Sequence, residues 1–319
     1  MEKNMLVGVD IGGTTVKIAL IDIEGTMKMK WEINTNTAEH GKYIVSDIVH
    51  SVEEKLKENA ISKDNVIGIG LGAPGFIDVE KGLIFEAVNL GWKDFALKEK
   101  MEEAIHIPTF VDNDANLAAV GEMWQGAGEG AENLLCVTLG TGVGGGVIAG
   151  GEIIHGQSGM AGEIGHIATV LENGAPCNCG KKGCLETVAS ATGIARLGTE
   201  AATVSTAGVL KDTLEANGAL TAKDVFDAAK AGDTVAQNVV KEASHHLGLV
   251  LANLANALNP EKIVLGGGVS KAGDILVGEI KKYFTSYAIP KIGRETHIKI
   301  ATLGNDAGVY GAAWLAKQG

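Results

Sequence analysis

Apolar and polar positions divide the first 125 residues into alternating strand-like and helix-like segments. Apolar residues at helical spacing predict helices over 39–60 and 115–125, with another near 96–104. Strands that alternate with helices indicate an α/β protein with a largely parallel sheet flanked by helices. Short apolar runs bounded by glycine and polar turns predict strands at 5–10, 16–22, 27–33, 66–71 and 109–112, of which the first three form a meander.

A second unit of the same kind follows. A strand at 133–139 leads through a glycine-rich turn into another strand at 147–154, which repeats the strand, turn and strand of the N-terminus. Residues 187–259 are alanine-rich and helix-like, a short strand follows at 263–265, and the last helix is expected at 307–317.

The repeated unit predicts two related α/β lobes that face a cleft. We place a small lobe at 1–117, with the helix 307–317 packing back on it, and a large lobe at 118–306. No Ser, Pro or Gly linker separates the two, so we expect them to pack closely and to hinge.

Composition and charge narrow the possible partners. Glycine makes up 45 of the 319 residues, about twice its usual share of ~7%. The net charge of −12 repels phosphate backbones and anionic lipid. No apolar stretch approaches the ~20 residues of a membrane span, and the N-terminus lacks the basic and apolar regions of a signal peptide. We therefore expect a cytoplasmic protein without nucleic-acid or membrane partners.

The first constellation with candidate chemistry is DIGGTTVK, residues 10–17. Glycines at a tight turn let backbone N–H groups approach an anion, and Thr14 and Thr15 add hydroxyl donors. Asp10 at the strand end could reach a phosphate-bound Mg²⁺. An ordinary hairpin turn is the alternative, and no Walker A sequence occurs in the chain.

Two other segments, 70–75 and 140–146, match the G-x-G-x-x-G pattern of dinucleotide-binding loops. That motif requires a helix directly after the glycines. Strand-like, turn-rich sequence follows both segments, so a dehydrogenase fold is disfavoured.

Two acids lie where a strand is expected to end and a helix to begin, in VDNDANLAAVGE at 111–122. Asp112 or Asp114 could cap the helix, the commoner use of aspartate at such a junction. A general base needs the same rigid placement at a cleft edge. The residues alone favour a cap for one of the two acids and leave the other open.

The most specific constellation is a group of one histidine and three cysteines. His166, Cys177, Cys179 and Cys184 place four ligands on a short glycine-rich loop, which suits tetrahedral Zn²⁺ in a closed structural site. A disulfide is disfavoured because three clustered cysteines leave one unpaired. Cys136, the remaining cysteine, lies in an apolar strand and is expected to be buried. The zinc loop would also fix two neighbouring carboxylates, Glu163 and Glu186.

Together these constellations resemble the ROK family of sugar kinases and repressors, within the hexokinase and actin-like ATPase superfamily. The segments DIGGTT, NDAN, LGTGVGGG, GEIGH, CNCGKKGCLE and IVLGGGVS occur here in the family's order, across essentially the whole chain. Two further runs, VNLGWKDFAL and GEMWQGAG, resemble the bacterial members that phosphorylate glucose. The resemblance implies the two-lobed actin-like (ribonuclease H-like) fold, with duplicated mixed sheets around a cleft.

The resemblance also implies a role for each matching residue. Asp114 would be the general base that takes the proton from the sugar 6-hydroxyl, and Asp112 would be structural. His166 would use one ring nitrogen for zinc and face the sugar with the other. The sugar contacts would be Gly75, Asn89, Asn113, Asp114, Glu163, His166 and Glu186, and the nucleotide contacts would be Asp10, Gly12, Gly13, Thr14, Thr15, Lys17, Thr141, Gly142, Gly267 and Gly268.

The expected activity is ATP-dependent phosphorylation of glucose at the 6-hydroxyl, with Mg²⁺, a structural Zn²⁺ and a homodimer. A kinase for fructose, mannose, N-acetylmannosamine or N-acetylglucosamine is one alternative. A sugar-responsive repressor is the other, disfavoured because only nine residues precede Asp10 where such repressors carry a helix-turn-helix domain.

Overall fold

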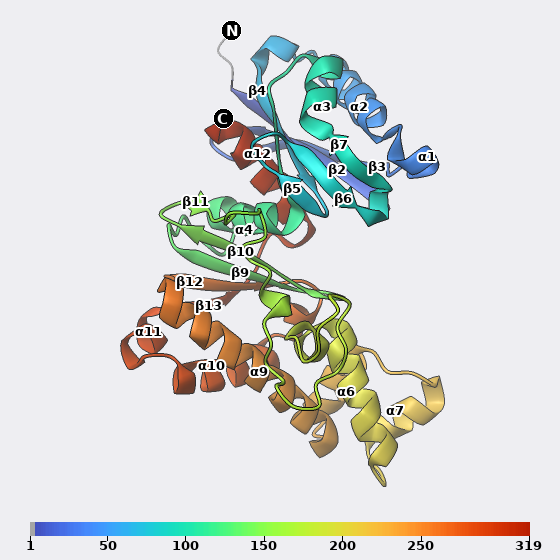
Figure 1. The fold of residues 1–319 in the computed structure, drawn as a ribbon, viewed down its shortest axis with the longest axis vertical. Helices are drawn as coiled ribbons and strands as arrows, with labels where there is room; N and C mark the ends of the chain where they lie inside the picture. The colour runs from blue at the N-terminus through green and yellow to red at the C-terminus, as the bar shows by residue number, and fades with distance from the viewer. Residues whose placement is uncertain (1–3) are drawn as a thin grey trace.

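The computed structural model describes residues 4–319 and contains two five-stranded sheets, one above the other (Figure 1). The first has the order β3-β2-β1-β4-β8. It is mixed rather than largely parallel, because the predicted meander β1–β2–β3 is antiparallel while β4 and β8 join it in parallel. Its strands are β1 (Met5–Ile11), β2 (Thr15–Asp22), β3 (Met27–Asn34), β4 (Val66–Ala73) and β8 (Thr109–Asn113).

The second sheet has the same plan, with the order β11-β10-β9-β12-β13. One detail of the sequence reading is wrong: the expected glycine turn at 140–146 is mostly strand, because β10 begins at Val143. A Cβ added to Gly146 would lie 2.6 Å from the Cβ of Ala119, so a glycine at this position lets the helix that carries Ala119 pack closely against the strand. The strands are β9 (Leu134–Leu139), β10 (Val143–Ala149), β11 (Glu152–Ile153), β12 (Lys262–Gly266) and β13 (His297–Ile300).

A third, three-stranded antiparallel sheet was not predicted. It comprises β5 (Phe76–Asp78), β6 (Leu83–Ala87) and β7 (Trp92–Ala96). Trp92 and Phe95 stack with ring centroids 4.4 Å apart, although both lie in strand β7. The turn after β6 carries Asn89, so this small sheet holds one edge of the candidate site.

Helices form layers outside and between the two large sheets. α2 (Ile44–Glu58) and α3 (Leu97–Ile105) pack on one face of the first sheet through one apolar core. The helical pattern at 39–60 breaks at α1 (Ala38–Gly41), where Glu39 has a φ of 51°. The alanine-rich region forms α5 (Glu186–Ala189), α6 (Ala191–Val204), α7 (Val209–Asn217), α8 (Ala222–Lys230) and α9 (Thr234–Leu258), followed by α10 (Asp274–Tyr287) and α11 (Pro290–Glu295).

Two helices far apart in the sequence lie between the sheets: α4 (Asp114–Gln125) and α12 (Ala307–Gln318) (Figure 1). α12 packs on the first sheet through Val309 and Ala313. α4 packs on the second sheet through Val120 and Met123, beside Trp314 of α12. The C-terminal helix therefore covers the sheet formed by the N-terminal strands.

Candidate active site

The carboxyl ends of β1, β4 and β8 meet the β9–β10 turn and the end of β12 around one cavity of about 780 Å³. Parallel strands place their carboxyl ends at the same edge of a sheet, which is where α/β folds bind ligands. The cavity brings together most of the predicted site residues. Those that line it are Asp10, Lys17, Gly75, Asn89, Asp114, Thr141, Gly142, Glu163, His166, Glu186 and Gly267.

The other predicted residues do not line this cavity. The first glycine turn holds itself together instead: Gly12 N–H donates to the Thr15 carbonyl at 3.0 Å, and the Thr35 hydroxyl donates to the Gly12 carbonyl at 2.6 Å. Gly13 and Thr14 belong to the same turn, and a Cβ on Gly13 would lie 3.5 Å from that of Asn89. Asn113 and Gly268 line two smaller adjoining cavities.

Two carboxylates, those of Asp10 and Asp114, line the cavity and influence each other electrostatically. Asp114 is exposed to the cavity, while dense protein surrounds it on its other sides. This desolvation, together with the charge of Asp10, raises the pKa of Asp114 to about 6. Burial also raises the pKa of Asp10, against the opposing effect of Lys17, whose Nζ lies 3.8 Å from Asp10 Oδ2.

The N-cap of α4 is neither of the two acids but the residue between them. Asn113 Oδ1 accepts hydrogen bonds from the N–H groups of Ala115 at 2.9 Å and Asn116 at 3.4 Å. Its amide Nδ2 donates to the Gly75 carbonyl at 3.2 Å. The prediction that one acid caps this helix is therefore wrong. Asp114 Oδ1 accepts from Ala115 N–H at 2.8 Å, and Oδ2 has no hydrogen-bond partner in the part of the chain that the structure describes, which leaves it available for chemistry.

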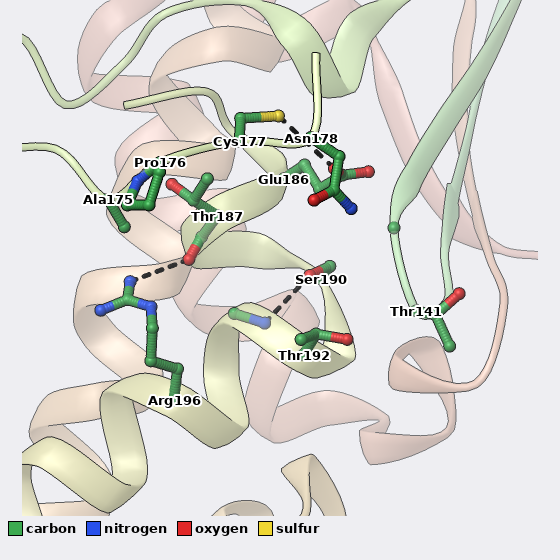
Figure 2. Close-up of a pocket in the computed structure, with 12 residues that line it drawn as sticks. Thr141, Ala175, Pro176, Cys177, Asn178, Glu186, Thr187, Ser190, Thr192 and Arg196 are labelled. Carbon is green, nitrogen blue, oxygen red and sulfur yellow. Dashed lines mark hydrogen bonds between the residues drawn. The ribbon is translucent and has the colours of Figure 1, made fainter. Parts of the chain in front are cut away.

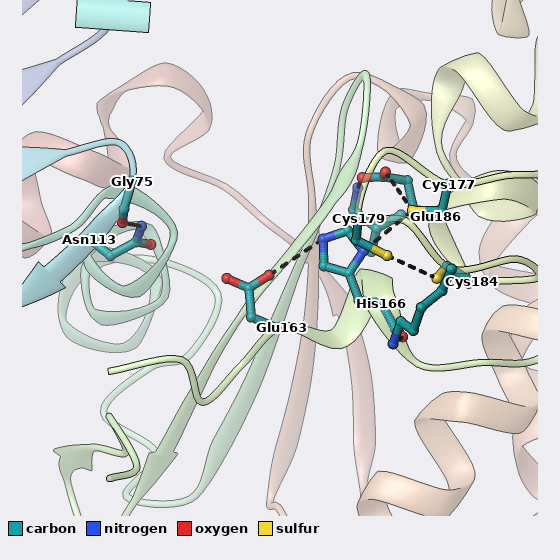
Figure 3. Close-up of polar contacts among 10 residues, drawn as sticks. Gly75, Asn113, Glu163, His166, Cys177, Cys179, Cys184 and Glu186 are labelled. Carbon is teal, nitrogen blue, oxygen red and sulfur yellow. Dashed lines mark hydrogen bonds and ion pairs between the residues drawn. The ribbon is translucent and has the colours of Figure 1, made fainter. Parts of the chain in front are cut away.

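The opposite wall carries the two predicted glutamates and His166. In Figure 3, Glu163 and His166 lie across a gap from Asn113 and Gly75, with His166 Nε2 3.8 Å from Glu163 Oε2. Glu186 accepts the Val143 N–H at 3.1 Å, so it supports the β9–β10 turn from behind.

The cysteine and histidine side chains converge as the spacing predicts. The ligand atoms of His166, Cys177, Cys179 and Cys184 all lie within 4.8 Å of one another. His166 Nδ1 is 3.5 Å from Cys177 Sγ, and the sulfurs of Cys179 and Cys184 are 3.6 Å apart. A tetrahedral zinc with bonds of about 2.0–2.3 Å separates its ligands by about 3.5–3.8 Å. The group therefore fits Zn²⁺, and it leaves Nε2 of His166 facing the cavity.

Two larger neighbours of the main cavity, one of them the Gly268 cavity named above, extend the site. The first, of about 490 Å³, lies behind Glu186 and Thr141; there Arg196 donates to the Thr187 carbonyl at 2.9 Å and Ser190 accepts from Gly193 N–H (Figure 2). The second, of about 380 Å³, lies between α6, α8 and the turn after β12, where Phe226 and Gly268 form part of its wall.

Sequence reasoning missed the contribution of the segment that leads into α12 and of the first turn of that helix. Gly304, Asn305 and Gly308 line the main cavity. Buried Glu122 holds this segment by accepting the N–H groups of Thr302 at 3.1 Å and Leu303 at 2.8 Å. These contacts join positions about 180 residues apart, so no local pattern could have indicated them.

Comparison with known proteins identifies the family of this chain. The sequence pattern of the ROK family matches residues 6–319. The chain belongs to the ROK family. A glucokinase of Halalkalibacterium halodurans is 57% identical over 318 residues, which cover 100% of this chain and 96% of that protein.

Solved structures of ROK proteins share the fold. A ROK family glucokinase from Streptomyces griseus, in complex with glucose and AMPPNP, is 34% identical with a TM-score of 0.77, and the match covers 99% of this chain and 100% of that one. A ROK family transcriptional regulator, a homologue of the E. coli MLC protein, is 26% identical with a TM-score of 0.85, over 98% of this chain and 78% of that one. The predicted family and its actin-like α/β fold are thus confirmed.

Across residues 4–319, every helix is too short or too polar to span a bilayer.

Proposed function

We propose that this ROK protein is a glucokinase, which transfers the terminal phosphoryl group of ATP to the 6-hydroxyl of glucose. One observation carries the proposal: the chain is 57% identical, over its whole length, to a glucokinase. In support of it, Asp10, Asp114 and Glu163 share one cavity. Phosphoryl transfer needs positioning, charge neutralisation and a base for the attacking hydroxyl.

Asp114 acts as that base in our proposal. It lies at the start of α4 and lines the cavity, and its pKa of about 6 leaves it mostly ionised at neutral pH. A positioned carboxylate of this kind contributes roughly 10²–10⁴ in rate. Asn113, which caps the same helix, orients the base and offers its amide to the sugar.

The sugar lies between the two walls of the cavity. Gly75, Asn89 and Asn113 contact it from the side of the first sheet, and Glu163, His166 and Glu186 contact it from the side of the zinc loop. Carboxylates, amides and an imidazole can each accept or donate hydrogen bonds to sugar hydroxyls. Zn²⁺ on Nδ1 of His166 would fix the ring so that Nε2 faces the sugar.

The nucleotide extends from the main cavity to the one beside α8. The Thr141–Gly142 turn lines the main cavity together with Lys17, and it would hold the phosphates through backbone N–H groups and a hydroxyl. In the first turn, Gly13 and Thr14 are exposed, Gly13 lies beside Asn89 at the rim of this cavity, and both residues would add donors from the other side. Gly267 and Gly268 lie at the junction with the 380 Å³ cavity, where Phe226 offers an apolar wall to the base. Mg²⁺ would neutralise phosphate charge, and the carboxylate of Asp10 is the hard oxygen ligand that suits it.

The proposal extends to the division of the chain into lobes and to its oligomeric state. We infer a small lobe at 1–117 and a large lobe at 118–306, supported by the contacts of α12 with β1 and β4. A homodimer in the cytoplasm is our working assembly. Light scattering of the purified protein would measure the mass of the assembly.

The reaction and its sugar are tested by ADP release over a panel of glucose, fructose, mannose, N-acetylglucosamine and N-acetylmannosamine. We expect glucose to give the highest kcat/KM. A clear preference for another sugar would replace glucose in the proposal. No turnover with any of them would overturn the kinase and favour a sugar-binding regulator.

The role of Asp114 is tested by Asp114→Asn. This substitution keeps the size of the side chain and removes the base, so kcat should fall by about 10²–10⁴ while glucose affinity stays within a few-fold. Asp212→Asn, an exposed acid on α7, is the matched control and should retain wild-type kinetics. An Asp114→Asn enzyme that keeps more than about a tenth of kcat contradicts the assignment.

A further inference from the structure

A buried carboxylate with no part in the proposed chemistry lies directly behind the base. Asp112 is fully buried at the end of β8. Its Oδ1 accepts from Asn113 N–H at 2.6 Å and from the Asn116 amide at 3.0 Å, and its Oδ2 is 2.6 Å from Nε2 of His155. Asp112 thus holds both the start of α4 and a histidine from elsewhere in the fold.

His155 comes from the opposite wall of the sugar site. It follows β11 in the second sheet, and it begins the loop that ends at Glu163. The loop closes on itself, because Ala161 N–H donates to the His155 carbonyl at 3.0 Å. It also rests on the third sheet, since a Cβ on Gly159 would lie 2.8 Å from the Ile77 carbonyl oxygen.

The short hydrogen bond between His155 Nε2 and Asp112 Oδ2, at 2.6 Å, is of the charge-assisted type. The hydrogen bond to Asp112 raises the pKa of His155 above its usual range, which favours an imidazolium paired with the carboxylate. Charge-assisted hydrogen bonds are about twice as strong as neutral ones. Without this donor, a fully buried carboxylate would lose its only partner at Oδ2 among the described residues.

We propose that His155 is a positioning residue for the sugar: its hydrogen bond to Asp112 keeps the loop ending at Glu163 in register with the junction that carries Asn113 and Asp114. Figure 3 shows Glu163 and Asn113 on the two sides of the gap. The His155–Asp112 bond joins the segments that carry these two residues. The inference rests on the proposed function, because it assigns the gap to the sugar. His155 itself touches neither the sugar nor the nucleotide, so it acts through Asp112 and the loop.

Three substitutions in the full chain separate this role from a merely structural one. In His155→Gln the amide nitrogen takes the place of Nε2 and can still donate to Asp112, whereas His155→Asn is too short and His155→Ala has no donor. We expect the Asn and Ala variants to raise the KM for glucose tenfold or more, with the KM for ATP changed less than threefold. The Gln variant should stay within about threefold of wild type for both substrates.

The comparison of the two KM values among these variants decides whether the proposal stands. Equal changes in the two KM values, or a Gln variant as impaired as the Ala variant, would overturn the proposal while leaving the kinase activity of the wild type intact. Wild-type enzyme without activity on any hexose would overturn the proposed function, and this inference with it. If the wild type prefers another hexose, the same comparison is made with that sugar.

A measurement on the wild type covers the case in which the Asn and Ala variants do not fold. The Nε2–H signal of His155 in ¹⁵N-histidine-labelled enzyme can be assigned by its loss in His155→Gln. We expect glucose to shift this signal and to slow its solvent exchange, and AMPPNP alone to change it little. A signal that saturating glucose leaves unchanged would overturn the proposal.

Discussion

At the scale of single residues, the environment of Asp114 determines the pH range of the proposed enzyme. Aspartate has an ordinary pKa of 3.8, and desolvation followed by the charge of Asp10 raises it here to about 6. Only the ionised form can take a proton from a hydroxyl. A base with this pKa is therefore half-inactivated near pH 6, about two units above an unperturbed aspartate.

This predicts an acid limb in the pH profile. With MgATP saturating, kcat/KM for glucose should be flat above pH 7 and fall about tenfold per pH unit below about pH 6, because protonation of Asp114 removes the base. Initial rates between pH 4.5 and 8.5 measure it, and Asp212→Asn should reproduce the wild-type curve. A limb near pH 4 would mean that Asp114 is not perturbed in this way.

At the scale of elements, the loop between His166 and Glu186 has little secondary structure to hold it. Within residues 4–319, its only regular strand pairings are two isolated bridges, Ala168 with Cys184 and Pro176 with Lys182. A few backbone hydrogen bonds cross the loop, such as Gly183 N–H to the Ala175 carbonyl at 2.9 Å, and Lys181 Nζ donates to the His166 carbonyl at 2.7 Å at the surface. A metal at the four converging ligands would stabilise this loop further, because binding free energy at a structural zinc site is folding free energy.

The zinc prediction follows from the four converging ligands in a loop with little helix or strand. Elemental analysis should find about one zinc per chain, and Cys179→Ser should lose the metal together with folded, active protein. Cys136→Ala, which changes the cysteine outside the cluster, should retain zinc in full. A metal-free wild type with full activity would refute the structural role of the loop.

At the scale of the whole molecule, helices α4 and α12 join the two sheets through backbone contacts that only glycine allows. A Cβ on Gly70 of β4 would lie 1.8 Å from the Ala312 carbonyl oxygen, and one on Gly8 of β1 would lie 2.0 Å from that of Val309. A Cβ on Gly311 of α12 would lie 1.8 Å from the Leu117 carbonyl oxygen of α4. Part of the glycine excess therefore serves close packing between the sheets rather than turns.

A pair of glycine substitutions tests this account. Gly70→Ala should push α12 away from the sheet and lower the free energy of unfolding by about 3 kcal/mol or more, the upper range for overpacked cores. Gly278→Ala, at a helical position of α10 with open space around it, should raise that free energy by about 0.5–1 kcal/mol. Urea unfolding measures both. Equal stability of the two variants would contradict the packing argument.

The sequence by itself determined the elements and the chemistry. The strand predicted at 16–22 is β2 (Thr15–Asp22), and the helix predicted at 307–317 is α12, because apolar periodicity is a local property of the chain. The zinc ligands were equally accessible, since Cys and His at short spacing carry their coordination chemistry in the residue type. The resemblance extended this to the acids and glycine turns of the cleft.

Only the tertiary structure decided which distant groups meet. It made Gly144–Gly146 part of strand β10 instead of a turn, with Gly144 and Gly146 facing α4 and Gly145 facing Ile164. It paired Asp112 with His155 and Glu122 with Leu303, across 43 and 181 positions of the chain. Such contacts depend on how the sheets and helices pack against one another. This packing joins residues that are far apart in the sequence, so no local pattern of residues predicts it.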